Sequence, residues 1–175
     1  MTVLTQLKPD EAIINLLKET YKDEDQTIKL LSAACLLKLN YKLPEDTVSA
    51  YLTNLETRSE FYTNLENFGL TDIADEELIT QEKIAEGSMY SFLRDENDVP
   101  NAIELLDTKE TEDGRYFLYK FEYVNNKKSN WYVGISGPQP LEDDFVSSYG
   151  FNTTSNFTLL NKKTIEEHWK ELLNE

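Results

Sequence analysis

The sequence predicts an α+β protein in which helices come first and a small antiparallel sheet follows. Apolar residues recur at helical spacing through the first 70 residues, alternate along residues 115–124, and return to helical spacing after Thr164. We therefore expect N-terminal antiparallel helical pairs packed on a small antiparallel sheet with flanking helices. This pattern divides the chain into a helical region, 1–70, and an α+β region, 71–175, which we expect to pack as one unit.

Four amphipathic segments make up the helical region. In each segment the apolar residues share one helical face, and the segments cover residues 11–21, 26–40, 43–58 and 59–69. A polar connector over 22–25 separates the first two, Pro44 stands near the start of the third, and Gly69 is placed to end the fourth. Cys35 lies inside the apolar run of the second helix, so we expect a buried thiol and no internal disulfide.

The second half mixes helix and strand signals. We expect a helix over 80–93, strands over 103–106, 115–124 and 131–136, and a terminal helix that begins with a capping box at Thr164 and Glu167. The terminal helix should bury Ile165, Trp169, Leu172 and Leu173, with His168 on its polar side. In the third strand, Trp131, Val133 and Ile135 share one face, and Gly134 marks a close approach of a neighbouring element. Ser136–Pro138 should end this strand, which we expect to be the last of the sheet.

The stretch DEAIINLLKETYKDEDQTIKLLSAACLLKLN, within residues 9–40, resembles a HEAT-type repeat. It consists of a short helix, an Asp-rich turn and a longer helix rich in Ala and Leu, and the likeness continues loosely to residue 69. Repeat modules need stacked neighbours to bury a continuous core, typically about three units or more. The resemblance therefore implies that the second half of the chain caps the helical pairs.

A second resemblance covers residues 80–138, through TQEKIAEGSMYSFL, PNAIELL, GRYFLYKFEY and WYVGISGP. This region is similar to a C-terminal domain that follows HEAT-like repeats in some bacterial proteins of uncharacterised function. Phe92 stands where that pattern usually has Trp. The resemblance implies an architecture and carries no established activity.

The charge is strongly acidic and unevenly distributed. The 175 residues carry 17 Lys and Arg against 33 Asp and Glu, a net charge of −16. From Glu56 to Asp98 twelve acids stand against three bases, a balance of −9. Such a surface repels phosphate backbones and anionic lipids, so we expect neither nucleic acid nor membrane as a partner. Two interpretations stay open, namely solubility and a docking face for a basic protein.

The motifs of common enzyme and cofactor sites are missing. The segment GISGPQ, residues 134–139, fits neither a dinucleotide-binding loop nor a phosphate-binding loop, and Ser136 falls one residue short of a nucleophile elbow. Its only available histidine is His168. One Cys and one His cannot form a structural zinc site, and the acidic clusters do not fit a calcium loop. We expect no catalytic residue, no cofactor and no metal.

The sequence therefore favours a non-enzymatic protein-interaction module, and an immunity-type inhibitor of a basic toxin is its most concrete form. The candidate binding residues are exposed acids and tyrosines: Asp72, Asp75, Glu76, Glu77, Glu82, Glu86, Tyr116 and Tyr132. The alternatives are a small-molecule sensor or a small hydrolase with a site between the helical and sheet halves. The N-terminus lacks the features of a secretory signal and no apolar run approaches the ~20 residues of a membrane span, so we expect a cytoplasmic protein.

Overall fold

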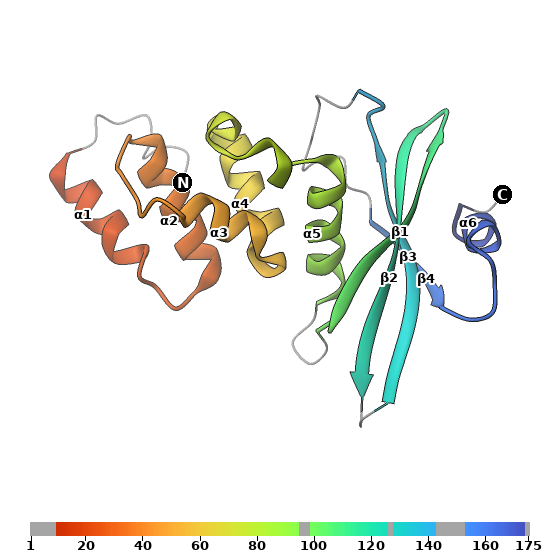
Figure 1. The fold of residues 1–175 in the computed structure, drawn as a ribbon. Coiled ribbons are helices and arrows are strands. Elements are labelled where there is room, and N and C mark those ends of the chain that lie inside the picture. The colour runs from red at the N-terminus through yellow and green to blue at the C-terminus, as the bar shows by residue number, and fades with distance from the viewer. Residues whose placement is uncertain (1–9, 95–98, 126–127, 143–152, 174–175) are drawn as a thin grey trace. The chain divides into compact units, whose positions relative to one another are not determined.

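The computed structural model describes residues 10–94, 99–125, 128–142 and 153–173. It confirms the α+β class, because helices come first and a four-stranded antiparallel sheet follows (Figure 1). The chain divides into two compact units, Met1–Ile79 and Thr80–Glu175. Within the described ranges, no helix is both long enough and apolar enough to cross a membrane.

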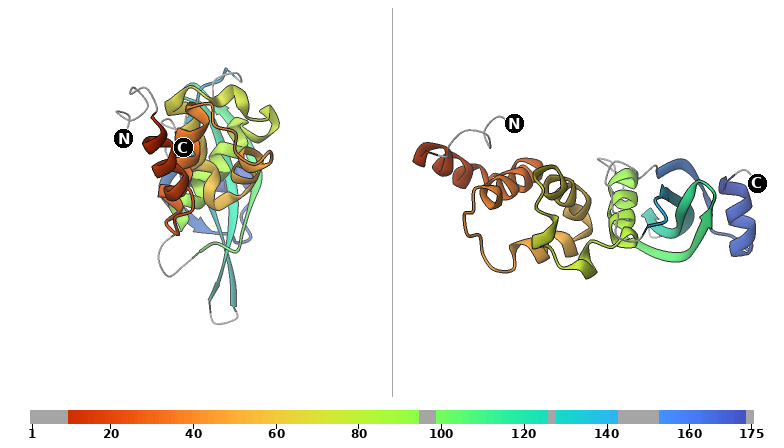
Figure 2. Two further views of the ribbon diagram at one scale, coloured as in Figure 1. Left: turned by 90° about the vertical axis from the view of Figure 1, so that its left-hand side faces the viewer. Right: turned by 90° about the horizontal axis from the view of Figure 1, so that it is seen from above.

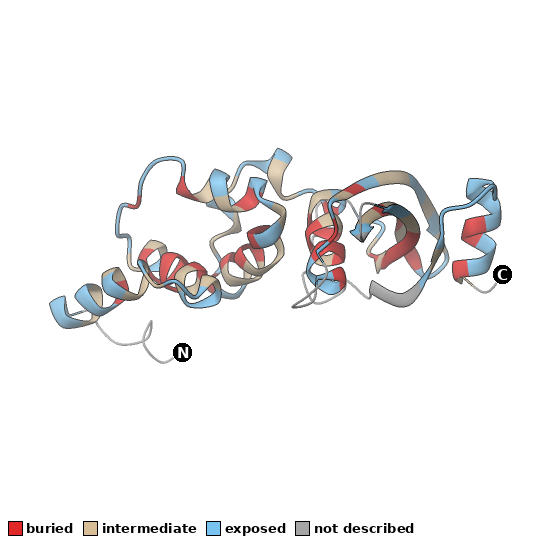
Figure 3. Cartoon of the chain, turned by 90° about the horizontal axis from the view of Figure 1, so that it is seen from below, coloured by how far each residue is buried: buried red, intermediate tan, exposed pale blue. Residues whose placement is uncertain are grey.

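The helical unit begins with an antiparallel pair. Its helices are α1 (Glu11–Thr20) and α2 (Gln26–Lys38). Asp10 and Asp25 cap them: the Asp10 carboxylate accepts from the Ile13 N–H at 2.8 Å, and that of Asp25 accepts from the Thr27 N–H at 2.9 Å. Half of the residues of α1 are exposed, whereas the middle of α2 is buried (Figure 3). Cys35 belongs to this buried run, as predicted, and burial raises the pKa of its thiol.

The third and fourth helices meet at Asn54, and not at Arg58 as the sequence predicted. The two helices are α3 (Thr47–Thr53) and α4 (Leu55–Phe68). Asn54 adopts an extended backbone and its side chain accepts from the Glu56 N–H at 2.9 Å, so it caps α4. The Thr57 hydroxyl donates to the Tyr51 carbonyl at 2.6 Å and satisfies the end of α3. These capping bonds make the break favourable in a segment whose apolar spacing is continuous.

The helical unit ends in two short 3₁₀ turns. Gly69 ends α4 in the left-handed conformation, with φ of 62°. The turns η1 (Thr71–Ile73) and η2 (Glu76–Leu78) follow and pack against α4 and α3 respectively. Residues 71–79 therefore belong to the helical unit.

The sheet is a meander of four antiparallel strands in the order β1-β2-β3-β4. Its strands are β1 (Ala102–Thr111), β2 (Gly114–Asn125), β3 (Lys128–Gln139) and β4 (Thr153–Leu159). The first strand is longer than the predicted 103–106, because a register shift between Leu105 and Asp107 allows its pairing with β2 to continue to the turn at Gly114.

The third strand is also longer than predicted, and it is not the last. We expected it to end at Ser136, but its pairing with β2 resumes at Gln139, opposite Arg115. A register shift between Arg115 and Phe117 accommodates Gly137 and Pro138 inside the strand. β4 then adds to β3, and the sequence pattern did not predict it because TTSNFTL carries only two large apolar residues.

Helix α5 (Gln81–Leu93) lies across one face of the sheet. Two tyrosines of β2 bind its backbone: the Tyr119 hydroxyl donates to the Glu82 carbonyl at 2.8 Å and the Tyr123 hydroxyl to the Leu93 carbonyl at 2.6 Å. A Cβ added at Gly134 would lie 3.3 Å from a ring atom of Phe121 and 3.6 Å from the Met89 Cε. The close approach predicted at Gly134 is thus the contact of α5 with the sheet.

Helix α6 (Ile165–Leu173) covers the opposite face (Figure 2). The capping box is confirmed, since the Thr164 N–H donates to the Glu167 carboxylate at 2.6 Å and the Glu167 N–H to the Thr164 hydroxyl at 3.3 Å. Its core is the buried cluster of Leu118, Val133, Ile135, Trp169 and Leu172. Two predictions for this helix were wrong: Ile165 is exposed, and His168 is buried.

Candidate functional site

The acidic surface of the helical unit is built by its two 3₁₀ turns. We call the four residues Asp72, Asp75, Glu76 and Glu77 the acidic turn surface, and all four are exposed. Asp75 caps the second turn, accepting from the Glu77 N–H at 3.2 Å. Because the turns are short and follow the left-handed Gly69, the carboxylates project from irregular backbone instead of packing along a helix.

The only base between Glu56 and Ile79, Arg58, is directed away from solvent. Its side chain is only 5% exposed, and its guanidinium donates to the carbonyls of Leu52 at 2.6 Å and Thr53 at 2.9 Å. A cation at a helix C-terminus satisfies free carbonyls and the negative end of the helix dipole. Within the described residues, no ion pair joins a Lys or Arg to the acidic turn surface.

Glu82 and Glu86, the other predicted acidic residues, lie in the second unit on α5. Glu82 is exposed and its backbone carbonyl accepts the Tyr119 hydroxyl. Glu86 is half-buried, and its carboxylate lies 3.6 Å from the Lys83 ammonium, one turn earlier on the helix. The structure therefore divides the six predicted acids between two units, four in the first and two in the second.

The two predicted tyrosines lie on opposite faces of the sheet. Tyr116 packs against the buried cluster under α6, and burial, followed by the charge of Asp113, raises the pKa of its hydroxyl. Tyr132 lies on the α5 face, where its ring is stacked on Phe121 at 5.8 Å and meets Phe157 edge-on at 5.8 Å. Because side chains along each strand alternate between the two faces, and these two rings lie on opposite faces, a single binding face of the sheet cannot contain both tyrosines.

Ser136 and His168 do not form a nucleophile and base. Ser136 is fully buried and pairs with Phe117 on the α5 face, whereas His168 belongs to α6 on the other face. The His168 Nδ1 lies 3.3 Å from the Thr158 hydroxyl. Burial, followed by the charge of Lys163, lowers the pKa of this histidine. A catalytic pair needs hydrogen-bond reach, and the sheet separates these two side chains.

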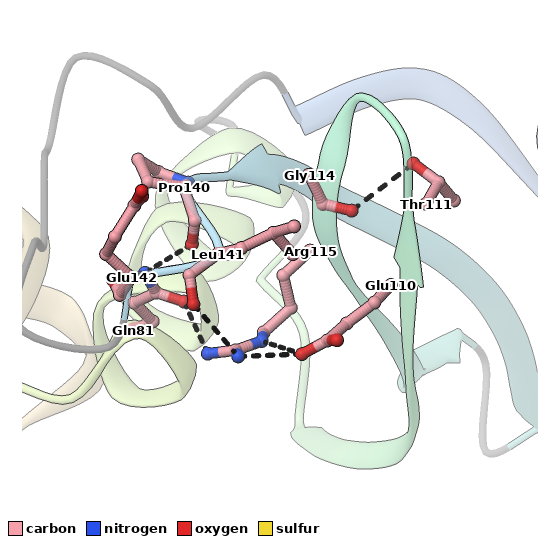
Figure 4. Close-up of polar contacts among 8 residues, drawn as sticks. All are labelled: Gln81, Glu110, Thr111, Gly114, Arg115, Pro140, Leu141 and Glu142. Atoms are coloured by element: carbon pink, nitrogen blue, oxygen red, sulfur yellow. Dashed lines mark hydrogen bonds and ion pairs between the residues drawn. The ribbon is translucent and has the colours of Figure 1, made fainter.

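A polar network that no sequence pattern predicts holds the end of β3 (Figure 4). The Arg115 guanidinium donates to the Glu110 carboxylate at 2.7 Å and to the Gln81 side-chain oxygen at 3.1 Å. The Gln81 amide donates in turn to the carbonyls of Pro140 at 2.9 Å and Glu142 at 3.2 Å. These contacts join the start of α5 to the chain that leaves β3. Because the groups named here bond one another, we assign the network a structural role.

In the described ranges, no group of three or more His, Cys, Asp or Glu side chains is arranged to hold a metal ion. Comparison with protein-family models, with curated proteins and with solved structures gave no match. The resemblance to HEAT-type repeats and to the region that follows them therefore stays a prediction.

Proposed function

We propose that this protein is a non-enzymatic protein-interaction module that binds a basic protein partner through its acidic turn surface. The observation that carries the proposal is the charge of residues 56–79, in which the one base is buried against helix carbonyls while the four carboxylates of the turns are exposed. An immunity-type inhibitor of a basic toxin is the concrete form that we propose.

Electrostatics supports this proposal. A net charge of −16 and a local concentration of carboxylates attract a cationic protein over distances comparable to the Debye length, about 8 Å at physiological salt. Such steering raises association rates and disfavours partners of the wrong charge. Irregular turns held on a helical scaffold are also a common location for binding residues.

The test compares two variants that change the charge equally. The first replaces the acidic turn surface with Asp72→Asn, Asp75→Asn, Glu76→Gln and Glu77→Gln. The control neutralises four other exposed acids: Glu11→Gln, Glu24→Gln, Glu45→Gln and Glu112→Gln. Each immobilised protein is exposed to extract of the source organism at low and high salt, and the bound proteins are identified by mass spectrometry.

The proposal expects the wild type and the control to retain the same basic protein at low salt and to release it at high salt. The first variant should retain little of it. The identified partner is then purified and its affinity measured directly. Equal retention by both variants, or binding that ignores salt, would overturn the proposal.

A further inference from the structure

The two edges of the sheet differ in how they are protected. β1, at one edge, carries Glu104, Asp107, Lys109 and Glu110 and is interrupted by a bulge. Charges and bulges are the usual means by which proteins keep sheet edges from pairing with other chains. β4, at the other edge, reads TTSNFTL and contains no charge, no proline and no glycine.

The hydrogen-bond pattern shows which backbone groups of β4 point outward. The Leu160 N–H, just beyond the strand, donates to the Trp131 carbonyl of β3 at 2.8 Å. In an antiparallel pair, residues alternate between bonding the neighbouring strand and pointing away from it. Tyr132 pairs with Leu159 and Gly134 with Phe157 in the same register, so the N–H and C=O groups of Phe157 and Leu159 face the open edge.

Exposed apolar side chains accompany this edge. Phe157 is 46% exposed, Leu159 55%, Leu160 37% and Ile165 43%. Phe157 and Leu159 lie on the α5 face, since they pair with Gly134 and Tyr132. A run of apolar side chains beside backbone groups that have no partner among the described residues fits an added strand better than solvent.

The local charge favours a second copy of this chain as the source of that strand. Residues 145–165 contain no Asp or Glu, which makes them the longest acid-free stretch of a sequence with 33 acids. Two copies that meet along β4 place no like charges opposite each other within the paired strands. We propose that the protein forms a two-fold symmetric dimer in which β4 strands pair antiparallel to make a continuous eight-stranded sheet.

One register satisfies the outward backbone groups. With the two-fold axis at Thr158, Phe157 lies opposite Leu159 of the second copy, and each pair exchanges two backbone hydrogen bonds. The apolar side chains of these two residues then meet across the seam on one face. Thr158 lies opposite Thr158 of the second copy as a non-hydrogen-bonded pair, in which the two Cα atoms are about 4.5 Å apart. A disulfide spans that distance.

The primary test is sedimentation equilibrium of the wild-type full chain over a range of protein concentrations and salt. The proposal expects a reversible dimer that becomes tighter as salt rises, because screening reduces the repulsion between two strongly negative chains. Leu159→Pro, which removes an outward N–H while leaving the bonds to β3, should weaken the dimer by about tenfold or more. A wild type that is monomeric at every concentration and salt would overturn the proposal.

Cross-linking keeps the test decisive if the proline variant does not fold. Under mild oxidation Thr158→Cys should form a covalent dimer in high yield, while Thr108→Cys, on the exposed edge of β1, should not. Equal yields from the two variants would contradict the register. The native Cys35 is fully buried and does not compete.

The dimer stands apart from the proposed function, and salt separates the two. Binding of a basic partner weakens as salt rises, whereas the dimer strengthens. The acidic turn variant should leave the dimer intact, and Leu159→Pro should leave partner binding intact, so either idea can fail alone.

Discussion

The indole N–H of Trp169 in α6 donates to the Asp107 carboxylate of β1 at 2.9 Å. Trp169 is almost fully buried, and Asp107 directly follows the bulge in β1. The bulge therefore places an acceptor where the terminal helix needs one, and this bond fixes α6 on its face of the sheet. A fully buried tryptophan with a satisfied N–H is a large contribution to a small core.

Removing the acceptor should leave the indole N–H without a partner. We expect Asp107→Ala to lower the free energy of unfolding by about 1–3 kcal/mol, the typical cost of a buried unsatisfied group. Asp107→Asn keeps a side-chain oxygen and should cost less. Urea denaturation of the three proteins measures the difference, and an Asp107→Ala variant as stable as the wild type would show that the bond contributes little.

Gly114 and Gly69 both have positive φ but differ in their surroundings. A Cβ at Gly114 would lie 2.4 Å from the Gln139 carbonyl oxygen, whereas one at Gly69 would meet nothing within 4 Å. Gly69→Ala should therefore cost only the left-handed backbone penalty, about 1–2 kcal/mol. Gly114→Ala should exceed about 4 kcal/mol or prevent folding. Thermal unfolding of the pair checks the prediction, which a similar loss for both would contradict.

His168 should make the stability depend on pH. Its pKa in the folded protein is lower than its ordinary value of 6.5, because the buried ring resists protonation. The unfolded state thus binds the proton more readily, and stability should fall as the pH drops below about 6.5 toward the folded pKa. Denaturation at a series of pH values tests this, with His168→Asn as the variant that should lose the dependence in that range.

Carboxylates act in a separate window. Hydrogen bonds from Thr164 lower the pKa of Glu167, and the hydrogen bond from Lys163 lowers that of Glu171, both from 4.5. Their contributions are present above that value and are lost as the pH falls through the folded pKa. The loss of stability between about pH 6.5 and about pH 5 should therefore come from the histidine alone. If that loss persists in His168→Asn, the histidine is not its source.

Ser136 should be replaceable without loss. Its hydroxyl is buried and, among the described residues, has no hydrogen-bond partner. We expect Ser136→Ala to keep the free energy of unfolding unchanged or raise it by up to about 1–3 kcal/mol, since an unpaired hydroxyl is removed from the core. Thr57→Ala is the control: this buried hydroxyl donates to the Tyr51 carbonyl, and its removal should cost about 1 kcal/mol. Equal losses would show that Ser136 has a partner.

Arg58 should matter for folding and not for binding. Arg58→Met removes the donors for the Leu52 and Thr53 carbonyls at the end of α3, and we expect a loss of about 1–3 kcal/mol. Because the side chain is buried, partner binding by the folded variant should equal that of the wild type. Stronger binding would mean that this charge acts at the surface.

Local signals determined much of the fold in advance. The boundaries of α1, α2 and α5, the capping box of α6 and the alternation of β2 all depend on residues within a few positions of one another, and periodicity and caps report such short-range preferences. The acidic character of residues 56–98 and the burial of Cys35 also follow from the sequence. The break at Asn54 was not predicted, because the apolar spacing continues through it. The hydrogen bonds of Thr57 and Arg58 outweigh that pattern and favour the break.

Tertiary structure decided what each face meets. Alternation shows that Tyr116 and its neighbours point to two sides of a strand, but only the packing of α5 and α6 reveals that Tyr116 and Tyr132 lie on opposite faces. The same packing separates Ser136 from His168 and buries the histidine, which the helical pattern placed on a polar side. β4 is a strand because it pairs with the edge of β3, since its own sequence has no strong strand pattern. The alternation of side chains along a strand follows from the local sequence. Which helix covers each face of the sheet depends on contacts between residues distant in sequence.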